Sequence, residues 1–247
     1  MASRPGRQSL QGISPELTVD RTDGWVPATE LVSGAAMDDF LDTAKQRWRA
    51  TPHAAAALAW KCYSYWLALP TVLGYAAARR VVLLRPESVL WKWSAQQPFL
   101  RVGLTSVGVA VLASDPLAAA GRQARLAAGI RVVADEDALL GEMRTSLVDE
   151  HLAPLLERVR DGIHISSRTF WGSLASGMAH GLSRAADVVP GPTLETADQV
   201  LSALGLRDLV EIAPRGGGQA GLSVHRKTCC LAFTLPEPKI CSGCCIR

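Results

Sequence analysis

Cysteine is almost missing from the body of this chain. Six of the 247 residues are cysteines, and Cys62 is the only one that precedes position 229. The sequence also lacks a readable secretory signal, because Arg4 and Arg7 are followed by no apolar segment. The expected compartment is therefore the cytoplasm, where thiols stay reduced. Cysteines that cluster in such a protein favour metal or redox chemistry over disulfides.

A membrane-spanning segment is missing as well. The longest uncharged apolar run covers positions 62–78, contains Pro70, and lies between Lys61 and Arg79. A spanning helix needs about 20 apolar residues. We therefore expect no transmembrane segment and predict a buried helical hairpin here, with a peripheral membrane contact as the open alternative.

Several other classes of protein are excluded by composition. Hydrophobic residues make up 48% and charged residues 20% of the chain, which indicates a globular protein rather than a disordered, collagen-like or coiled-coil one. The net charge of +3 is too small to predict nucleic-acid binding. No glycine-rich dinucleotide motif and no Walker sequence is present, so no nucleotide or flavin site is supported.

Charge is unevenly distributed along the chain. From position 214 onward the net charge is +4, whereas the preceding residues sum to −1. The basic residues of this tail are Arg215, Arg226, Lys227, Lys239 and Arg247. The tail is therefore chemically distinct from the body.

The periodicity of apolar residues predicts a mainly helical protein. Helices are expected over 35–49, over 54–69 with a short continuation after Pro70, over 137–160 with a break near Pro154 as an open alternative, over 166–186, and over 193–204. Thr51, followed by proline, is expected to cap the second helix, and Thr193 the last one. Four short β-branched or aromatic runs between about 80 and 113 predict an antiparallel meander of three or four strands.

These elements define the predicted organisation. The fold class is mainly α with a small antiparallel β-meander (α+β), and no internal repeat is present. Residues 1–34 are expected to be mostly irregular, 35–213 to form the helical body, and 214–247 to form the cysteine-rich segment. The run Gly216–Gly218 is predicted to link body and tail.

Four tail cysteines form a C-C-x10-C-x2-C array: Cys229, Cys230, Cys241 and Cys244. Residues 231–235 predict a strand, the prolines at 236 and 238 a turn, and residues 239–240 a returning strand. Such a β-hairpin would bring the four thiols together, and Gly243 would let the C-x-x-C loop wrap closely around a centre.

Both zinc and iron–sulfur clusters are bound by four thiolates. Side chains of adjacent cysteines diverge, which suits one small ion poorly and the wider [2Fe–2S] cluster better. The spacing therefore favours [2Fe–2S] over zinc, and a disulfide-bonded tail is the third alternative.

The array, preceded by Arg226, Lys227 and Thr228, resembles the C-terminal motif of the FhuF-type ferric siderophore reductases. Weaker similarity covers Trp60 and Lys61 with the nearby tyrosines, and positions 166–172. The resemblance implies that Cys229, Cys230, Cys241 and Cys244 hold a [2Fe–2S] cluster. It also implies one-electron reduction of siderophore-bound ferric iron, with electrons from an unidentified external donor.

Two positions depart from that pattern. Ser173 stands where family members often carry asparagine, and Cys245 adds a fifth thiol directly after the last predicted ligand. Cys62 is interpreted as a small buried hydrophobe.

Substrate contacts are expected from the helical body and the basic tail. The candidates are Arg168, Trp171, His180 and Lys227. Basic tail residues would offset the charge of a cluster and attract an anionic complex. Two alternatives remain open: a siderophore-binding or electron-carrier protein without turnover of its own, and a zinc-stapled interaction protein.

Overall fold

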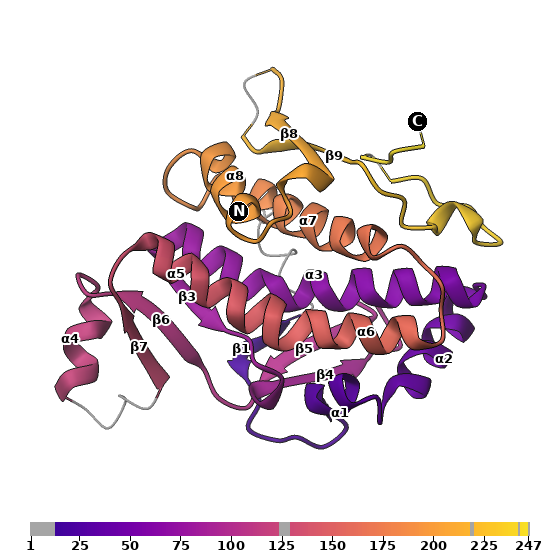
Figure 1. The fold of residues 1–247 in the computed structure, drawn as a ribbon, viewed down its shortest axis with the longest axis horizontal. Coiled ribbons are helices and arrows are strands. Elements are labelled where there is room, and N and C mark those ends of the chain that lie inside the picture. Colours follow the sequence, from indigo (N-terminus) through magenta and orange to yellow (C-terminus); the bar gives the residue numbers. More distant parts are fainter. Residues whose placement is uncertain (1–12, 124–128, 218–219, 242, 247) are drawn as a thin grey trace, which may run out of the picture.

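Two helices that pack against each other, α3 (Pro52–Ala78) and α7 (Ser167–Arg184), form the centre of the molecule (Figure 1). The computed structural model describes residues 13–123, 129–217, 220–241 and 243–246. The indole Nε1 of Trp60 donates to the carbonyl of Phe170 at 2.8 Å, inside the helix pair. The class is mixed α and β, with helices predominating and small sheets beside them.

The apolar run expected to form a hairpin lies in one continuous helix. Helix α3 begins where predicted, because the Thr51 hydroxyl accepts from the backbone N–H of Ala54 and Pro52 occupies the first turn. It then continues through Pro70, so the predicted hairpin is wrong. An interior proline costs a helix about 3 kcal/mol, and α3 is buried on most of its surface, so packing offsets that cost. No helix of the described residues has the length and apolar character needed to cross a membrane.

A second long rod lies beside this pair and contains a π-helical segment. Helix α5 (Glu136–Met143) runs into the π-helix η4 (Arg144–Leu152) and then into α6 (Ala153–Asp161). Pro154 does not break the rod, because it occupies the first turn of α6. His151 of η4 is fully buried. One of its ring nitrogens lies 2.6 Å from the carbonyl oxygen of Leu84 and the other 2.7 Å from the hydroxyl of Tyr63.

This histidine predicts a pH dependence of stability. Burial lowers the pKa of His151 to about 4, whereas an unfolded chain protonates it near pH 6.5. As the pH falls from 6.5 towards 4, the unfolded state takes up a proton that the folded state does not. The free energy of unfolding should therefore drop by about 3 kcal/mol over this range. Urea unfolding at a series of pH values measures the slope.

A His151→Gln variant separates this contribution from that of other groups. Its free energy of unfolding should fall less steeply between pH 6.5 and 4 than that of the parent protein. Equal slopes for the two proteins would contradict a buried neutral imidazole.

Shorter helices complete the body. They are α1 (Ala28–Ser33), α2 (Met37–Trp48), α4 (Pro116–Gln123) and α8 (Thr193–Ala203). The residue that caps α8 is Pro192, so the predicted cap at Thr193 is one position too late. The described part of the segment expected to be irregular contains α1 and two strands, β1 (Ile13–Thr18) and β2 (Val26–Pro27).

The four strands between 80 and 113 form where predicted but do not make one meander. Strands β4 (Val89–Trp93) and β5 (Leu100–Leu104) pair antiparallel and lie in a sheet of order β1-β5-β4-β2. Strand β3 (Arg80–Leu83) pairs instead with β6 (Gly108–Leu112), which pairs parallel with β7 (Ile130–Val133). A short 3₁₀ turn, η2 (Pro86–Ser88), separates β3 from β4, so β4 does not fold back onto β3.

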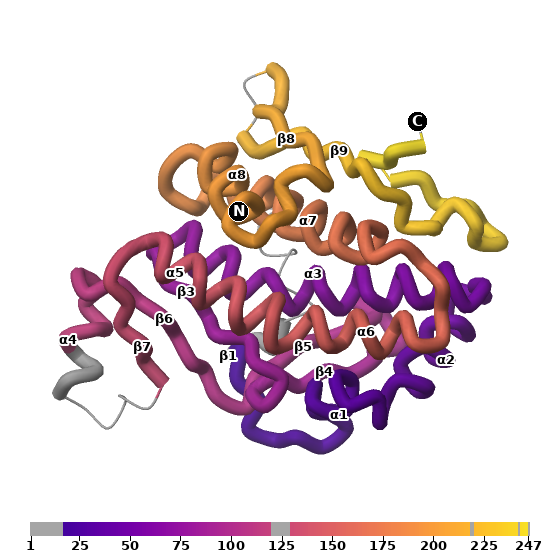
Figure 2. The backbone as a smooth tube through the Cα atoms, in the orientation of Figure 1, coloured from indigo at the N-terminus to yellow at the C-terminus, as the bar shows by residue number. Residues whose placement is uncertain are grey.

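The C-terminal region begins with a hairpin of β8 (Val210–Pro214) and β9 (Leu222–Arg226). Gly216 and Gly217 lie in its connection, so the predicted linker joins these two strands; Gly218 lies outside the described residues. Beyond β9 the chain passes over the part of α3 near α2 (Figure 2).

The predicted cysteine hairpin is absent from the described residues of the tail. Positions 232–234 form a 3₁₀ turn, η6 (Ala232–Thr234), in place of a strand. Leu231 has a left-handed backbone with φ 60°, which turns the chain away from an extended path. Three buried tail residues, Cys230, Ala232 and Leu235, belong to the same hydrophobic core as Trp60. The tail therefore packs as part of the body.

Candidate functional site

The tail is attached to helix α7 by a close contact that requires glycine. A Cβ atom at Gly172 would overlap the side chain of Thr228, directly before the first tail cysteine. In the next position of the helix, the Ser173 hydroxyl accepts from Nη2 of Arg226 at 2.8 Å. The helix segment and the tail segment that carry the family resemblance are thus in direct contact.

The C-x-x-C loop lies against strand β9. The backbone N–H of Arg226 donates to the carbonyl of Gly243 at 2.9 Å, and a Cβ atom at Gly243 would overlap the carbonyl of Val224. The N–H of Cys244 donates to the carbonyl of Cys241 at 3.1 Å, which closes a turn between the two cysteines. Gly243 was predicted to let the C-x-x-C loop wrap closely around a centre. In the structure it lets the loop pass close to the backbone of β9.

Cys229 and Cys241 each lie within electrostatic reach of Cys230 and Cys244. Thiolate charge on Cys230, Cys244 and Cys245 acts on Cys229, and charge on Cys230 and Cys244 acts on Cys241. Burial is the main cause of the raised pKa of both Cys229 and Cys241. Within the described part of the chain, no three His, Cys, Asp or Glu side chains converge as ligands of a single metal ion.

The surroundings of two tail cysteines stabilise their sulfur atoms. Cys229 accepts a hydrogen bond, and nearby positive charge favours the thiolate of Cys230. The N–H of Leu231 donates to the Sγ of Cys229 at 3.3 Å, which the left-handed backbone of Leu231 makes possible. Burial opposes ionisation of Cys230, but the charge on Lys61, a backbone N–H of Ala232 and the charge on Arg226 outweigh it. The pKa of Cys230 is therefore lowered.

Arg226 is a buried cation without a counter-ion. Its side chain is 5% exposed, and Nε and Nη1 have no hydrogen-bond partner. Among the described residues, no carboxylate lies within ion-pair distance of it. A buried unpaired charge costs several kcal/mol. An anionic group beside Arg226 would remove that cost.

The positive charge beside these cysteines is of the sign that a [2Fe–2S] cluster would need. Four thiolate ligands give the oxidised cluster a net charge of about −2, and hydrogen bonds to the sulfurs are a recognised feature of such sites. The residues that would hold it are Cys229, Cys230, Cys241 and Cys244. Arg226 and Lys61 supply the compensating positive charge.

A cavity of about 330 Å³ opens next to these cysteines, between α3 and α7. One wall comes from Lys61, Cys62, Tyr65 and Trp66, and another from Ser173, Ser176, Gly177, His180 and Arg184. The tail closes it with Arg226 and Cys241. A molecule in this cavity would therefore touch one of the predicted ligands.

Only one of the four predicted substrate residues, His180, lines the cavity. Burial, with the nearby charges of Arg184 and Lys61, lowers the pKa of His180 to about 4, so its ring is neutral near pH 7. Arg168 is exposed and pairs with Asp208 at 3.2 Å, which removes it from the cavity wall.

The other two residues also face elsewhere. Trp171 packs edge-on against Trp60, with ring centroids 5.7 Å apart. The ammonium of Lys227 points towards Glu211, 3.8 Å away. Neither residue lines the cavity, so Arg168, Trp171 and Lys227 remain predicted substrate residues that lie outside its wall.

Lys61 and Arg184 were missed as lining residues. A signal for them exists: Ser176, His180 and Arg184 recur at four-residue steps on α7, and Lys61 and Tyr65 do so on α3. What the spacing does not show is that these two helix faces meet.

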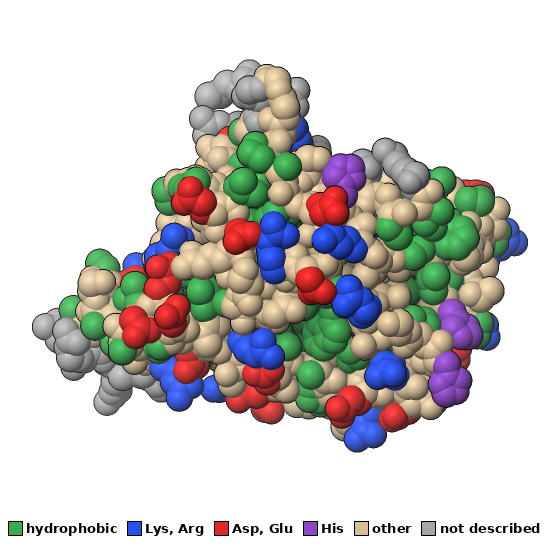
Figure 3. All heavy atoms as spheres, turned by 45° about the horizontal axis from the view of Figure 1, so that its top comes forward, with side chains coloured by type: hydrophobic (Ala, Val, Ile, Leu, Met, Phe, Trp, Pro, Cys, Tyr) green, Lys and Arg blue, Asp and Glu red, His purple; other side chains and the backbone are tan. Residues whose placement is uncertain are grey.

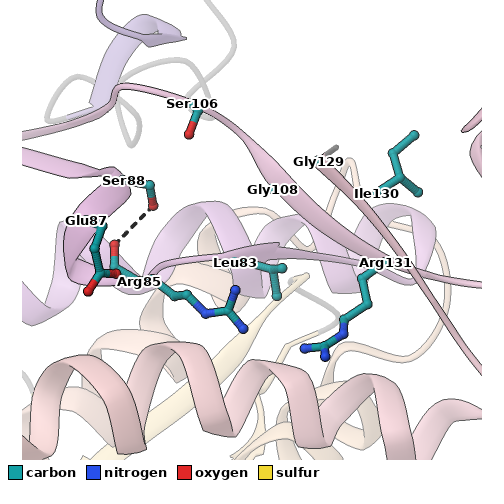
Figure 4. Close-up of a pocket in the computed structure, with 9 residues that line it drawn as sticks. All are labelled: Leu83, Arg85, Glu87, Ser88, Ser106, Gly108, Gly129, Ile130 and Arg131. Carbon is teal, nitrogen blue, oxygen red and sulfur yellow. Dashed lines mark hydrogen bonds between the residues drawn. The ribbon is translucent and has the colours of Figure 1, made fainter. Parts of the chain in front are cut away.

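A second cavity, of about 360 Å³, lies at the edge of the β3-β6-β7 sheet (Figure 4). Arg85 and Arg131 extend from this edge, and each is already paired, with Glu150 and Glu142 respectively, at 2.7 Å. Its cations are therefore neutralised, unlike Arg226 in the cavity beside the cysteines.

In comparisons with known proteins, no family model matches this chain and no curated protein is significantly similar to it.

Proposed function

We propose that this protein reduces the ferric iron of siderophore complexes in the cytoplasm by means of a [2Fe–2S] cluster. The cluster would be held by Cys229, Cys230, Cys241 and Cys244. The observation that carries the proposal is the buried guanidinium of Arg226, which has no carboxylate partner among the described residues, acts by its charge on Cys230 and Cys241, and lines a cavity together with Lys61 and Arg184. Such an arrangement fits an anionic metal centre beside a binding site.

The chemistry needs a carrier of single electrons. When bound, a [2Fe–2S] cluster accepts and delivers one electron at a time, which matches the Fe(III)/Fe(II) couple. Siderophores hold Fe(III) with hard oxygen donors, and Fe(II) prefers such donors less, so reduction promotes release of the metal.

The protein's own residues tune and orient this chemistry. The positive charges of Lys61 and Arg226 lie near Cys230 and Cys241, where they would offset added negative charge and raise the reduction potential. Cys241 lines the cavity, so an iron complex bound there would lie next to one of the predicted cluster ligands.

The electron would come from an external one-electron donor, such as a reduced iron–sulfur or flavin protein. Apolar side chains gather over the C-terminal segment (Figure 3). The exposed ones include Phe233, Ile240 and Ile246.

The proposed reaction balances as a one-electron transfer. One electron enters the protein from the donor, the ferric ion becomes ferrous, and no covalent bond of the protein forms or breaks.

The test is a single-turnover experiment on protein purified without oxygen. Iron, sulfide and zinc are first quantified together with a visible spectrum. The protein is then reduced with dithionite, freed of excess reductant, and mixed with a ferric siderophore and a ferrous-specific chelator. We expect the cluster spectrum to return to the oxidised form while Fe(II) appears in an equal amount.

Three outcomes contradict the proposal in different ways. A colourless protein that contains zinc points to the zinc-stapled interaction protein. A cluster that stays reduced while no Fe(II) forms, although the siderophore binds, points to a binding protein. A cluster that is oxidised only by another redox protein points to an electron carrier.

A further inference from the structure

The cavity beside the cysteines is strongly biased towards negative ligands. Lys61, Arg184 and Arg226 line it, and no aspartate or glutamate does. His180 is neutral near pH 7 and adds no charge. Even beside an oxidised cluster, whose charge is about −2, these three cations leave the site positive.

Arg226 brings positive charge to the cavity wall, while its Nη2 donates to Ser173 and Thr228. Its Nε and Nη1 are buried and unbonded, and the residue forms part of the cavity wall. Guanidinium and ammonium groups attract carboxylates and other anionic oxygen groups. The cations in the cavity wall, Lys61, Arg184 and Arg226, therefore favour anionic oxygen donors.

The cavity wall also contains a pair of aromatic side chains. Tyr65 and Trp66 lie edge to face, with ring centroids 4.9 Å apart. Gly177 leaves space for Tyr65 against α7, because a Cβ atom there would lie 3.2 Å from the tyrosine ring. Flat aromatic or conjugated groups pack well against such side chains.

The size of the cavity limits what enters it. A volume of about 330 Å³ lies at the lower end of the range for small-molecule pockets. It suits one chelating arm of an iron complex rather than the whole complex. An arm bound there would share the cavity with Cys241.

We propose that this cavity binds an anionic chelating arm, a catecholate or a carboxylate, and that it thereby selects negatively charged ferric complexes. This inference rests on the proposed function. Three hydroxamates neutralise Fe(III) and leave an uncharged complex, whereas three catecholates, each doubly negative, leave a large negative charge. The site therefore disfavours neutral trihydroxamate complexes.

Gallium complexes test the binding without electron transfer, because Ga(III) resembles Fe(III) but is not reduced. Calorimetric titration of the cluster-loaded protein compares Ga(III) tris-catecholate, Ga(III) citrate and Ga(III) tris-acetohydroxamate. We expect at least one of the two anionic complexes to bind at least about tenfold more tightly than the neutral one. Raising the salt concentration should weaken only the binding of anionic complexes.

Variants of the lining residues connect the binding to this cavity. Arg184→Gln and Lys61→Gln should each weaken binding of the preferred anionic complex about tenfold, which corresponds to one lost charge-assisted hydrogen bond. Arg160→Gln is the matched control, because Arg160 is exposed on α6 and does not line the cavity. Equal binding of neutral and anionic complexes would overturn the inference, and so would unchanged affinity in both variants.

The titrations with the catecholate complex and the citrate complex also show which kind of anionic oxygen donor the cavity prefers. Preference for the catecholate complex assigns a role to the aromatic pair, and preference for citrate assigns the selectivity to Arg226 and Arg184. If gallium complexes bind as expected but the reduced protein yields no Fe(II), the proposed function fails while this inference stands. If neutral and anionic ferric complexes are both reduced and gallium binding shows no selectivity, the inference alone fails.

Discussion

The Cys241→Ser variant should lose the visible absorption of a [2Fe–2S] cluster and, with it, the reduction of ferric siderophores. Cys241 begins the C-x-x-C turn, lies within reach of the charges on Cys230 and Cys244, and lines the cavity. Its replacement removes one of four thiolates. Anaerobic reconstitution followed by iron and sulfide analysis and a visible spectrum measures the effect.

Cys62→Ser is the matched control, because Cys62 lines the same cavity from α3. Burial raises the pKa of Cys62 to about 11, so it stays a neutral thiol and is not expected to ligate iron. The variant should show a normal cluster spectrum. A normal spectrum for Cys241→Ser together with a lost spectrum for Cys245→Ser would exchange the two residues in the ligand set.

The Gly243→Ala variant should detach the C-terminal loop from strand β9. Its Cβ atom would overlap the carbonyl of Val224, and backbone has little room to move because the N–H of Arg226 is bonded to the same loop. We expect a loss of about 3 kcal/mol in the free energy of unfolding, at the upper end of overpacking effects. Urea unfolding measures this loss, and limited proteolysis should cleave the tail first.

Gly141→Ala provides the comparison for this effect. Gly141 lies in α5, has an ordinary helical backbone, and has nothing within 4 Å of the position of an added Cβ atom. This variant should be more stable by up to about 1 kcal/mol, because alanine is the better helix former. If Gly243→Ala were as stable as the parent protein, the loop would not be packed on β9.

The helices were predictable from sequence because their signals are local. Thr51 and Pro52 mark the start of α3, and apolar periodicity defines α7. Strand pairing was not predictable in the same way. The run at 80–83 indicates a strand, but its partner is 108–112 and not the next strand in the sequence. Packing against α3 and α5 determines this pairing.

The candidate site was predictable only in part for the same reason. The cysteine array is a local pattern, so its four residues can be singled out as predicted ligands from the sequence. The predicted hairpin failed because Leu231, a residue without glycine's freedom, adopts a left-handed backbone that tertiary packing selects. Arg226 reads as one more basic tail residue, and only its burial beneath Ser173 and Thr228 distinguishes it.

The cavity is built jointly by the body and the tail, since Lys61 and Arg184 belong to helices and Arg226 and Cys241 to the C-terminal segment. A ligand that bridges the two parts binds only when the tail is docked. By linkage, its binding stabilises the docked tail, and a loosened tail lowers the apparent affinity. A ligand bound in this cavity should then protect the cysteine segment from proteolysis and from oxidation.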